Sequence, residues 1–310
     1  MVAIPFDSQD AWHRLRAAHI GGSEVAALFG ESPYTTRWQL WHQKRGTLAA
    51  PDLSSNVAVT GGRHMEPALA GWAAEKWGMA VRKVKVYLED DTEPGLGASL
   101  DFETEGGEPV EIKFSLWGDG WDWERDTITD YPLSYGLQVQ AQLAVTGAAR
   151  GWLVAFCGGD LRRCQIQRSE AIVEALRREV GLFWLGVRQG IEPSPDFEKD
   201  AAAIDRLYAV AEDRIINLSD DATAAELCVR FLDACRRENI AKSEHDAARA
   251  ELLVKLGTAK GATIGDFRVL APAIPGSLGT LITPEMVDTY IGGRAGYRRL
   301  TLKREQKKGT

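Results

Sequence analysis

The feature that most constrains how this chain folds is an acidic residue set at a fixed distance before an acid and an amine. Asp101 stands ten residues before the tripeptide Glu111-Ile112-Lys113, and two adjacent glycines lie between them. Residues i and i+2 of a strand project from the same face, so Glu111 and Lys113 share a face and Ile112 packs behind them. A turn at the glycines folds the two strands into a hairpin. The spacing therefore predicts that Asp101 lies beside Glu111.

Two carboxylates and an amine in one place suit the chemistry of phosphodiester hydrolysis. Carboxylate oxygens are the ligands of Mg²⁺ and Mn²⁺, which fill their other positions with water and substrate phosphate. Such an ion lowers the pKa of bound water and neutralises charge on the phosphorus, and Lys113 is left to contact the phosphate or the water. By itself the motif is equally compatible with an exposed strand whose charged side chains are merely solvated.

Four segments of the chain together resemble the YqaJ-type viral recombinase family, whose best-known relative is the lambda-type phage exonuclease. The similarity follows the order of the family through roughly the first 190 residues. The segments are 12–16 with 20–26, 61–67, 97–101 with 110–113, and 135–143. The resemblance implies an α/β fold with a restriction-endonuclease-like PD-(D/E)xK core, in which helices flank a mixed sheet.

The same resemblance implies a metal site. Asp101, Glu111 and the main-chain carbonyl of Ile112 would hold the ion, and Glu66 would support a second one from a helix. The proline after Glu66 suggests that this helix begins near it, and an acid in a first turn is also favoured by the helix dipole without any catalysis.

The segment 135–143 resembles the family helix that supplies a glutamine to the site. Of its three glutamines, Gln140 is selected by its place in the motif, to hydrogen bond with a metal-bound water or phosphate beside Lys113. Glutamine is also a good helix former that is often only solvated.

Basic and hydroxyl groups near the N-terminus carry the expected DNA contacts. By resemblance, Arg16 grips the terminal 5′-phosphate, while Ser23 offers its hydroxyl and the N–H groups of the helix that it starts. A plain N-cap at Ser23 is the simpler alternative, and both roles are compatible. Arg63 is one of several basic residues available to line a DNA channel.

The resemblance implies a Mg²⁺-dependent exonuclease, with Mn²⁺ as a substitute, that digests one strand of double-stranded DNA from its 5′ end and leaves a 3′ overhang for recombination. Relatives form a trimeric ring around the duplex and work with a single-strand annealing protein. Two alternatives remain open: a structure-specific or restriction-like endonuclease on the same core, and a catalytically silent DNA-binding phage protein.

Composition limits where and how the chain works. The net charge of −7 argues against nonspecific coating of DNA, although a local basic channel is compatible with it. No run of eighteen apolar residues and no signal pattern occurs, so we expect a cytoplasmic protein without a membrane partner. Its cysteines lack C-x₂-C spacing, which favours buried free thiols over an iron–sulfur cluster. These are Cys157, Cys164, Cys228 and Cys235.

A segment with two prolines at 191–195 predicts a boundary between a nuclease domain, residues 1–190, and a C-terminal extension, residues 191–310. The extension is expected to hold a long helical arm over 221–256 and a small α/β tail with a short helix near Thr283. Apolar residues recur along the arm at coiled-coil-like intervals. The arm is expected either to pack on its own core or to contact another subunit or a partner.

Overall fold

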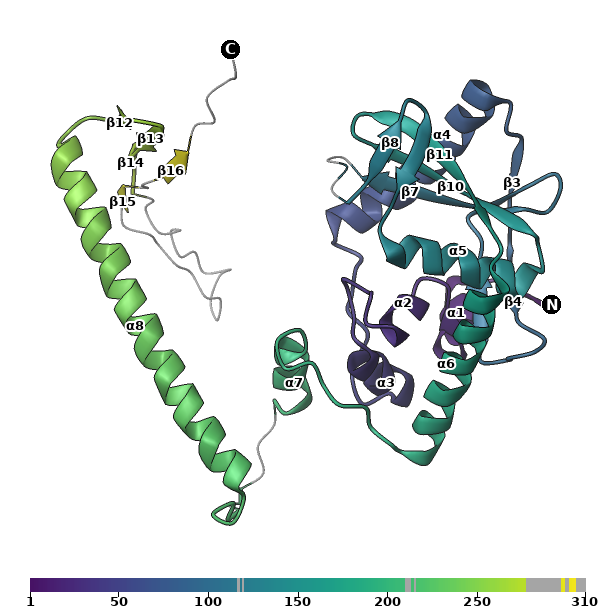
Figure 1. Ribbon diagram of the computed structural model, residues 1–310, viewed down its shortest axis with the longest axis horizontal. Helices are drawn as coiled ribbons and strands as arrows, with labels where there is room; N and C mark the ends of the chain where they lie inside the picture. The colour runs from purple at the N-terminus through teal and green to yellow at the C-terminus, as the bar shows by residue number, and fades with distance from the viewer. Residues whose placement is uncertain are drawn as a thin grey trace, which may run out of the picture. The chain divides into compact units, whose positions relative to one another are not determined.

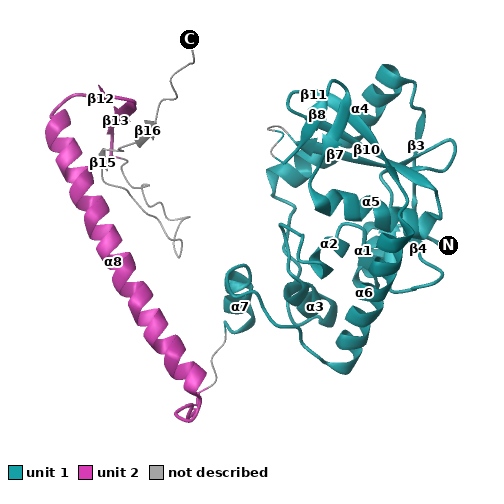
Figure 2. Ribbon diagram, in the orientation of Figure 1, with its two compact units in different colours: residues 1–212 teal, residues 213–310 magenta. Residues whose placement is uncertain are grey.

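The computed structural model describes residues 1–115, 118, 120–209, 213–214, 216–276, 297–298 and 301–304. The chain divides into two compact units, Met1–Glu212 and Asp213–Thr310 (Figure 2). The helix predicted near Thr283 lies outside the described residues.

The first unit is built on a seven-stranded mixed sheet in the order β3-β6-β7-β10-β11-β9-β8. Its central strands β7 and β10 are parallel, whereas β10 pairs with β11 antiparallel. The bounds are β3 Val81–Lys83, β6 Phe102–Thr104, β7 Pro109–Ser115, β8 Asp122–Glu124, β9 Thr127–Asp130, β10 Arg150–Cys157 and β11 Asp160–Gln167. The inner strands are rich in residues buried on both sides, as expected for a sheet covered on two faces.

A smaller sheet in the order β1-β4-β5-β2 completes the β-structure of this unit. Its strands are β1 Val2–Pro5, β2 Ile20–Gly21, β4 Val86–Glu89 and β5 Leu96–Ser99. Strand β5 is followed directly by Asp101 and β6, so the chain passes from the small sheet into the central sheet at the predicted acid.

Helices cover both faces of the central sheet (Figure 1). The helices of this unit are α1 Gln9–Ala18, α2 Val25–Leu28, α3 Arg37–Arg45, α4 Val57–Trp77, α5 Leu133–Thr146, α6 Glu170–Gln189 and α7 Ala201–Leu207, of which α4 and α5 contact the central sheet most. Leu69 and Ala73 of α4 pack with Ile112 in one core cluster, whereas Leu137 and Ala141 of α5 belong to a second cluster with α2 and α6. The predicted α/β class, a mixed sheet flanked by helices, is confirmed.

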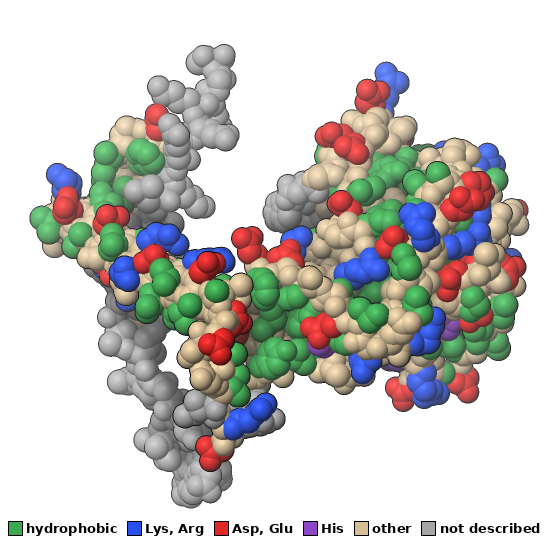
Figure 3. Space-filling model, turned by 60° about the horizontal axis from the view of Figure 1, so that its bottom comes forward, with side chains coloured by type: hydrophobic (Ala, Val, Ile, Leu, Met, Phe, Trp, Pro, Cys, Tyr) green, Lys and Arg blue, Asp and Glu red, His purple; other side chains and the backbone are tan. Residues whose placement is uncertain are grey.

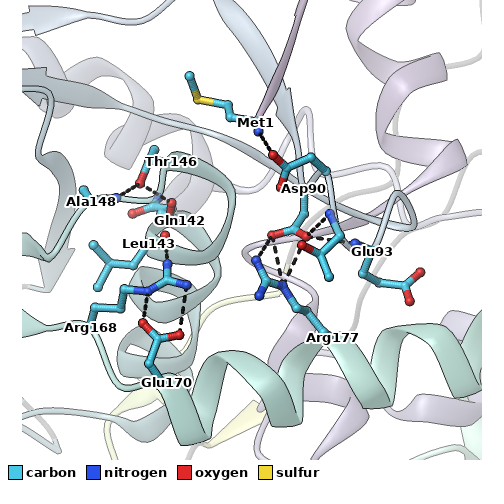
Figure 4. A network of polar contacts seen from close by, with 12 residues as sticks. Met1, Asp90, Glu93, Gln142, Leu143, Thr146, Ala148, Arg168, Glu170 and Arg177 are labelled. Atoms are coloured by element: carbon cyan, nitrogen blue, oxygen red, sulfur yellow. Dashed lines mark hydrogen bonds and ion pairs between the residues drawn. The ribbon is translucent and has the colours of Figure 1, made fainter.

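A buried ion pair fastens α6 to the end of β4 (Figure 4). The Asp90 side chain is fully buried and accepts hydrogen bonds from Arg177 Nη2 at 2.8 Å and Nε at 3.2 Å. The main-chain N–H groups of Thr92 and Glu93 also donate to Asp90, at 2.9 and 2.8 Å. Buried carboxylates are tolerated only when they are bonded in this way.

The compact unit extends beyond the predicted boundary at residue 190. Ala203 of α7 is buried with Trp38 of α3 and Leu48 in a separate cluster. The buried Asp200, which precedes α7, accepts from Thr36 Oγ1 and Gln39 Nε2, both at 2.7 Å. These contacts hold the segment after the two prolines against the first unit, and the division falls at Glu212.

The second unit contains α8 Ala222–Leu256, which is 35 residues long and capped by the Asp221 side chain. Strands β12 Gly261–Ile264, β13 Phe267–Leu270 and β16 Thr301–Arg304 form one small sheet, and β14 Ala273–Ile274 pairs with β15 Tyr297–Arg298. The predicted helical arm is thus present. Among the described residues, no helix has the length and apolarity needed to cross a membrane.

All four cysteines are free. Cys157 is buried, as predicted, and burial raises the pKa of the half-buried Cys164 thiol to about 11. The prediction is wrong for Cys228, which is exposed because it lies on the surface of α8, whose one buried residue is Leu256.

Candidate active site

The hairpin of β6 and β7 brings the acids and the amine of the sequence motif together. Phe102 pairs with Val110, so Asp101 lies opposite Glu111, and the Ile112 N–H donates to Asp101 Oδ2 at 3.1 Å. Lys113 Nζ donates to Glu111 Oε1 at 2.6 Å. Glu111 and Lys113 therefore share a face, and the Ile112 side chain is buried on the other. We refer to Asp101, Glu111 and Lys113 as the acid–lysine cluster.

Two glutamines of α5 complete the hydrogen bonding of Glu111. Gln138 Nε2 donates to Glu111 Oε1 at 2.7 Å, and Gln142 Nε2 donates to Oε2 at 2.5 Å. Gln138 also accepts from Lys113 Nζ at 3.1 Å. Glu111, which is 2% exposed, is therefore held by three side chains.

The selection of Gln140 from the sequence is corrected by the structure. Its Nε2 donates to the Gln167 carbonyl at 2.7 Å, and its Oε1 accepts from the Ser169 N–H at 3.0 Å. Gln138 and Gln142 are four residues apart and share a helix face, while Gln140 points about 200° away. Gln140 joins α5 to the segment before α6, and Gln138 is the glutamine that contacts Lys113.

Crowding of negative charge perturbs Asp101. Burial raises its pKa to about 8, with further contributions from the charges of Glu111 and Glu66, while Lys113 acts in the opposite direction. Among the described residues, however, Glu66 does not form a group of three metal-holding acids with Asp101 and Glu111. The Glu66 carboxylate makes an ion pair with Lys83 Nζ at 3.3 Å.

The position of Glu66 within its helix differs from the prediction. Helix α4 begins at Val57, where the Asn56 side chain accepts from the N–H groups of Ala58 and Val59, and it continues through Pro67. Glu66 therefore lies in the middle of the helix rather than in its first turn. A favourable helix dipole does not explain an acid there, because that effect is confined to the first turn.

The acid–lysine cluster suits a hard divalent cation, although it does not form a complete set of ligands. No three His, Cys, Asp or Glu side chains of the described residues are grouped so that they could hold a metal ion. Asp101 and Glu111 provide two oxygen donors, which is enough for Mg²⁺ when water and substrate phosphate supply the rest. The buried Gln142 Oε1 beside Glu111 has no partner in the described part of the chain, which is typical of a site that takes an ordered water.

The proposed phosphate-binding residues also lie together. Arg16 Nη2 donates to Ser23 Oγ at 3.4 Å, and the guanidinium lies 4.8 Å from the Trp12 ring centre. Trp12 Nε1 in turn donates to Ser99 Oγ at 2.8 Å, two residues before Asp101. Ser23 is exposed, but it does not cap α2, because that helix begins at Val25 and has four residues. The expected contribution of helix N–H groups at Ser23 is therefore wrong.

A buried lysine that the sequence did not single out shapes this loop. Lys44 Nζ donates to the carbonyls of Arg16 and His19, both at 2.7 Å, and to Glu24 Oε2 at 2.9 Å. Burial lowers the pKa of Lys44. At Gly22 a Cβ would lie 3.5 Å from the Gln138 carbonyl oxygen, so the loop packs directly on α5 beside the acid–lysine cluster.

Arg63 belongs neither to the acid–lysine cluster nor to the phosphate-binding pair of Arg16 and Ser23. It is exposed on α4, and among the described residues no hydrogen bond or ion pair links it to Arg16 or Ser23.

Two tyrosines lie near Lys113 of the acid–lysine cluster. Lys113 Nζ is 4.8 Å from the Tyr135 ring centre. Burial raises the pKa of the Tyr135 phenol, and the nearby Tyr34 raises it further. Tyr34 is 80% exposed, so an aromatic ring stands in solvent at the border of the cluster.

Comparison with known proteins identifies the central part of this unit. Residues 11–149 match the model of the YqaJ-like viral recombinase domain. By this match, the segment resembles a YqaJ-like domain. The matched segment contains all the candidate site residues: Arg16, Ser23, Arg63, Glu66, Ile112, the acid–lysine cluster and the glutamines of α5.

Three individual proteins are also similar to this chain. The chain is 27% identical over 225 residues to the uncharacterized protein YqaJ of Bacillus subtilis (strain 168), covering 70% of this chain and 68% of that protein. An alkaline exonuclease from Laribacter hongkongensis, LHK-Exo, aligns with a TM-score of 0.45 at 19% identity, over 63% of this chain and all of that one. A putative exonuclease from Eubacterium rectale aligns with a TM-score of 0.47 at 13% identity, over 70% and 98%.

Proposed function

We propose that this protein is a Mg²⁺-dependent exonuclease that digests one strand of double-stranded DNA in the 5′-to-3′ direction and leaves a 3′ single-stranded overhang. The observation that carries the proposal is the acid–lysine cluster inside a YqaJ-like domain. Two carboxylates and a lysine at the end of a hairpin are the groups that metal-assisted phosphodiester hydrolysis needs.

The side chains of the cluster divide the work. Asp101 and Glu111 would hold the ion together with the Ile112 carbonyl, and Glu66 would support a second one. When bound, Mg²⁺ or Mn²⁺ lowers the pKa of a coordinated water and neutralises charge that develops on the phosphate. Lys113 and Gln138 contact each other beside Glu111, so they can orient the attacking water or a phosphate oxygen.

Arg16 and Ser23 would select the end of the duplex. An arginine whose guanidinium already reaches an exposed serine hydroxyl presents two donors to a terminal 5′-phosphate. Gly22, next to Ser23, packs on α5 at Gln138, so a phosphate held by Ser23 would lie near the acid–lysine cluster. A trimeric ring around the duplex and a single-strand annealing partner are further parts of the proposal, and they rest on the family resemblance alone.

The decisive experiment compares linear duplex DNA with covalently closed circular DNA in the presence of Mg²⁺. We expect linear molecules to lose nucleotides from the strand labelled at its 5′-phosphate, and closed circles to remain intact. Addition of EDTA should stop the release. Cleavage of the closed circle would replace the exonuclease by the endonuclease alternative, and an absence of any hydrolysis by the wild type would leave only a DNA-binding role.

Substitutions of Gln138 and Gln140 should separate an effect on activity from an effect on stability. We expect Gln138→Ala to lower the rate of nucleotide release about a hundredfold with little effect on the free energy of unfolding, because Gln138 contacts Lys113 and Glu111. Gln140→Ala should lower the free energy of unfolding by about 1–3 kcal/mol and leave the rate per folded molecule near that of the wild type.

Nucleotide release and urea unfolding of both glutamine variants measure this difference. Each variant is the control for the other, since the substitution is the same and the positions lie on opposite faces of α5. A loss of rate in Gln140→Ala that matches the loss in Gln138→Ala would contradict the assignment of Gln138.

A further inference from the structure

Helix α8 leaves apolar side chains uncovered over most of its length. At 35 residues it is about 50 Å long, and Leu256 near its end is its one buried residue. Phe231 and Leu227 are 69% and 55% exposed. Apolar side chains lie in the open between acidic and basic ones along the arm that α8 forms (Figure 3). An exposed helix of this kind typically marks an interaction site.

One stripe of α8 follows the heptad spacing of a coiled coil. Its members are separated alternately by four and three residues, and they are Leu227, Phe231, Ala234, Glu238, Ala241, His245, Ala248 and Leu252. Leu227, Phe231 and Ala234 line the same surface hollow, which places the first members of the stripe on one face. Small alanines in three of the eight positions allow a second helix to approach closely.

Charged residues flank this stripe in an ordered way. The residue before each of four stripe positions is charged, at intervals of seven: Arg230, Arg237, Glu244 and Glu251. The first two are basic and the last two are acidic. In coiled coils these flanking positions determine partner choice and orientation.

The flanking charges are complementary to a second copy of the same helix running in the opposite direction. In that arrangement Arg237 meets Glu244 of the second copy and Arg230 meets its Glu251, so that two copies form four attractive pairs. In a parallel pair Arg237 would instead meet Lys242, which has the same sign, and Glu244 would meet Arg249, so that repulsive and attractive pairs would be equal in number. The arrangement is its own two-fold image, as a contact between identical subunits requires.

The stripe itself supports the same alignment. The antiparallel register places Phe231 against Ala248 of the second copy, so that a large side chain faces a small one. Leu227 then faces Leu252 at both ends. Glu238 stands near the middle and His245 lies further toward one end, and polar residues in such a stripe specify register at some expense of stability.

We propose that α8 is a self-association surface on which a second copy of this chain packs antiparallel along the stripe from Leu227 to Leu252. The second copy is favoured over a different protein because the basic and acidic flanking positions of one helix complement each other. Self-association through α8 does not depend on nuclease activity, and its test measures the mass of the assembly rather than hydrolysis.

The test uses the full chain and two neighbouring substitutions, one in the stripe of α8 and one outside it. Phe231→Ser removes the largest side chain of the stripe. Leu232→Ser changes a residue outside the stripe that is 55% exposed. We expect sedimentation equilibrium to show a wild-type assembly with twice the mass of the Phe231→Ser protein, and a dissociation constant raised about a hundredfold or more. Leu232→Ser should keep the wild-type mass. Pairing through α8 doubles the mass of the assembly whether the first unit is a single chain or part of a ring.

Charge exchange tests the orientation. Arg237→Glu should weaken the assembly about tenfold, because it creates two repulsive pairs, whereas Arg236→Glu on the outer face should not. The double variant Arg237→Glu/Glu244→Arg should recover the wild-type dissociation constant. Circular dichroism confirms that each variant is folded. Equal masses for the wild type and Phe231→Ser would overturn self-association, and failure of the double variant to recover would overturn the antiparallel arrangement.

Discussion

Glu111→Gln is expected to reduce Mg²⁺-dependent nucleotide release from linear duplex DNA by about a hundred- to a thousandfold. The substitution keeps the shape of the side chain but removes the charge that Lys113 Nζ contacts at 2.6 Å. It also removes one of the two carboxylates that we propose to hold the cation. The buried lysine would then lack the partner that, together with Asp101, raises its pKa.

The matched control for Glu111→Gln is the same substitution at Glu105. That residue is exposed near the turn of the same hairpin, so Glu105→Gln changes the charge of the protein by the same amount outside the acid–lysine cluster. Initial rates and the binding of Mn²⁺ should be measured for both variants after their far-ultraviolet circular dichroism has been compared with the wild type. Equal rates for Glu111→Gln and Glu105→Gln would remove Glu111 from the mechanism.

Arg177→Leu is expected to give the largest loss of stability, about 3–5 kcal/mol in the free energy of unfolding of the first unit. It leaves the fully buried Asp90 carboxylate without its cation, while the N–H groups of Thr92 and Glu93 satisfy only part of it (Figure 4). The contact joins α6 to the end of β4, so its loss also loosens the small sheet.

The control for Arg177→Leu is the same change at the next residue. Arg178 is 63% exposed and its guanidinium is 3.8 Å from Glu179, so Arg178→Leu should change the free energy of unfolding by no more than about 0.5 kcal/mol. Urea unfolding followed by tryptophan fluorescence measures both. If the two variants were equally stable, the Asp90 pair would contribute nothing beyond a surface contact.

The glutamines of α5 show where a sequence pattern stops being informative. Glutamines two residues apart lie on opposite faces of a helix, whereas those four apart share a face, and a motif gives no measure of how that helix is rotated. Rotation is determined by packing: Val139 and Leu143 are fully buried against the central sheet, whereas Leu137 and Ala141 join the cluster of α2 and α6. With those residues inside, Gln138 and Gln142 face Glu111, and Gln140 faces the strand end.

The sequence pattern likewise located neither the end of the first unit nor the start of α4. Pro67 suggested a helix start, yet the helix begins at the Asn56 cap and continues through the proline, which leaves Glu66 in its interior. A proline inside a helix removes one hydrogen bond, and the burial of Leu69 and Ala73 compensates for the loss.

The sequence by itself determined the acid–lysine cluster. Asp101, Glu111 and Lys113 lie within one hairpin, where the alternation of a strand and the position of a turn fix which side chains meet. Only the tertiary structure decided which residues contact that cluster from elsewhere: Gln138 and Gln142 reach Glu111 from α5, whereas Glu66 of α4 does not complete a group of three acids in the described part of the chain. These contacts join segments far apart in the chain, so they depend on how helices pack and rotate on the sheet, which no local pattern specifies.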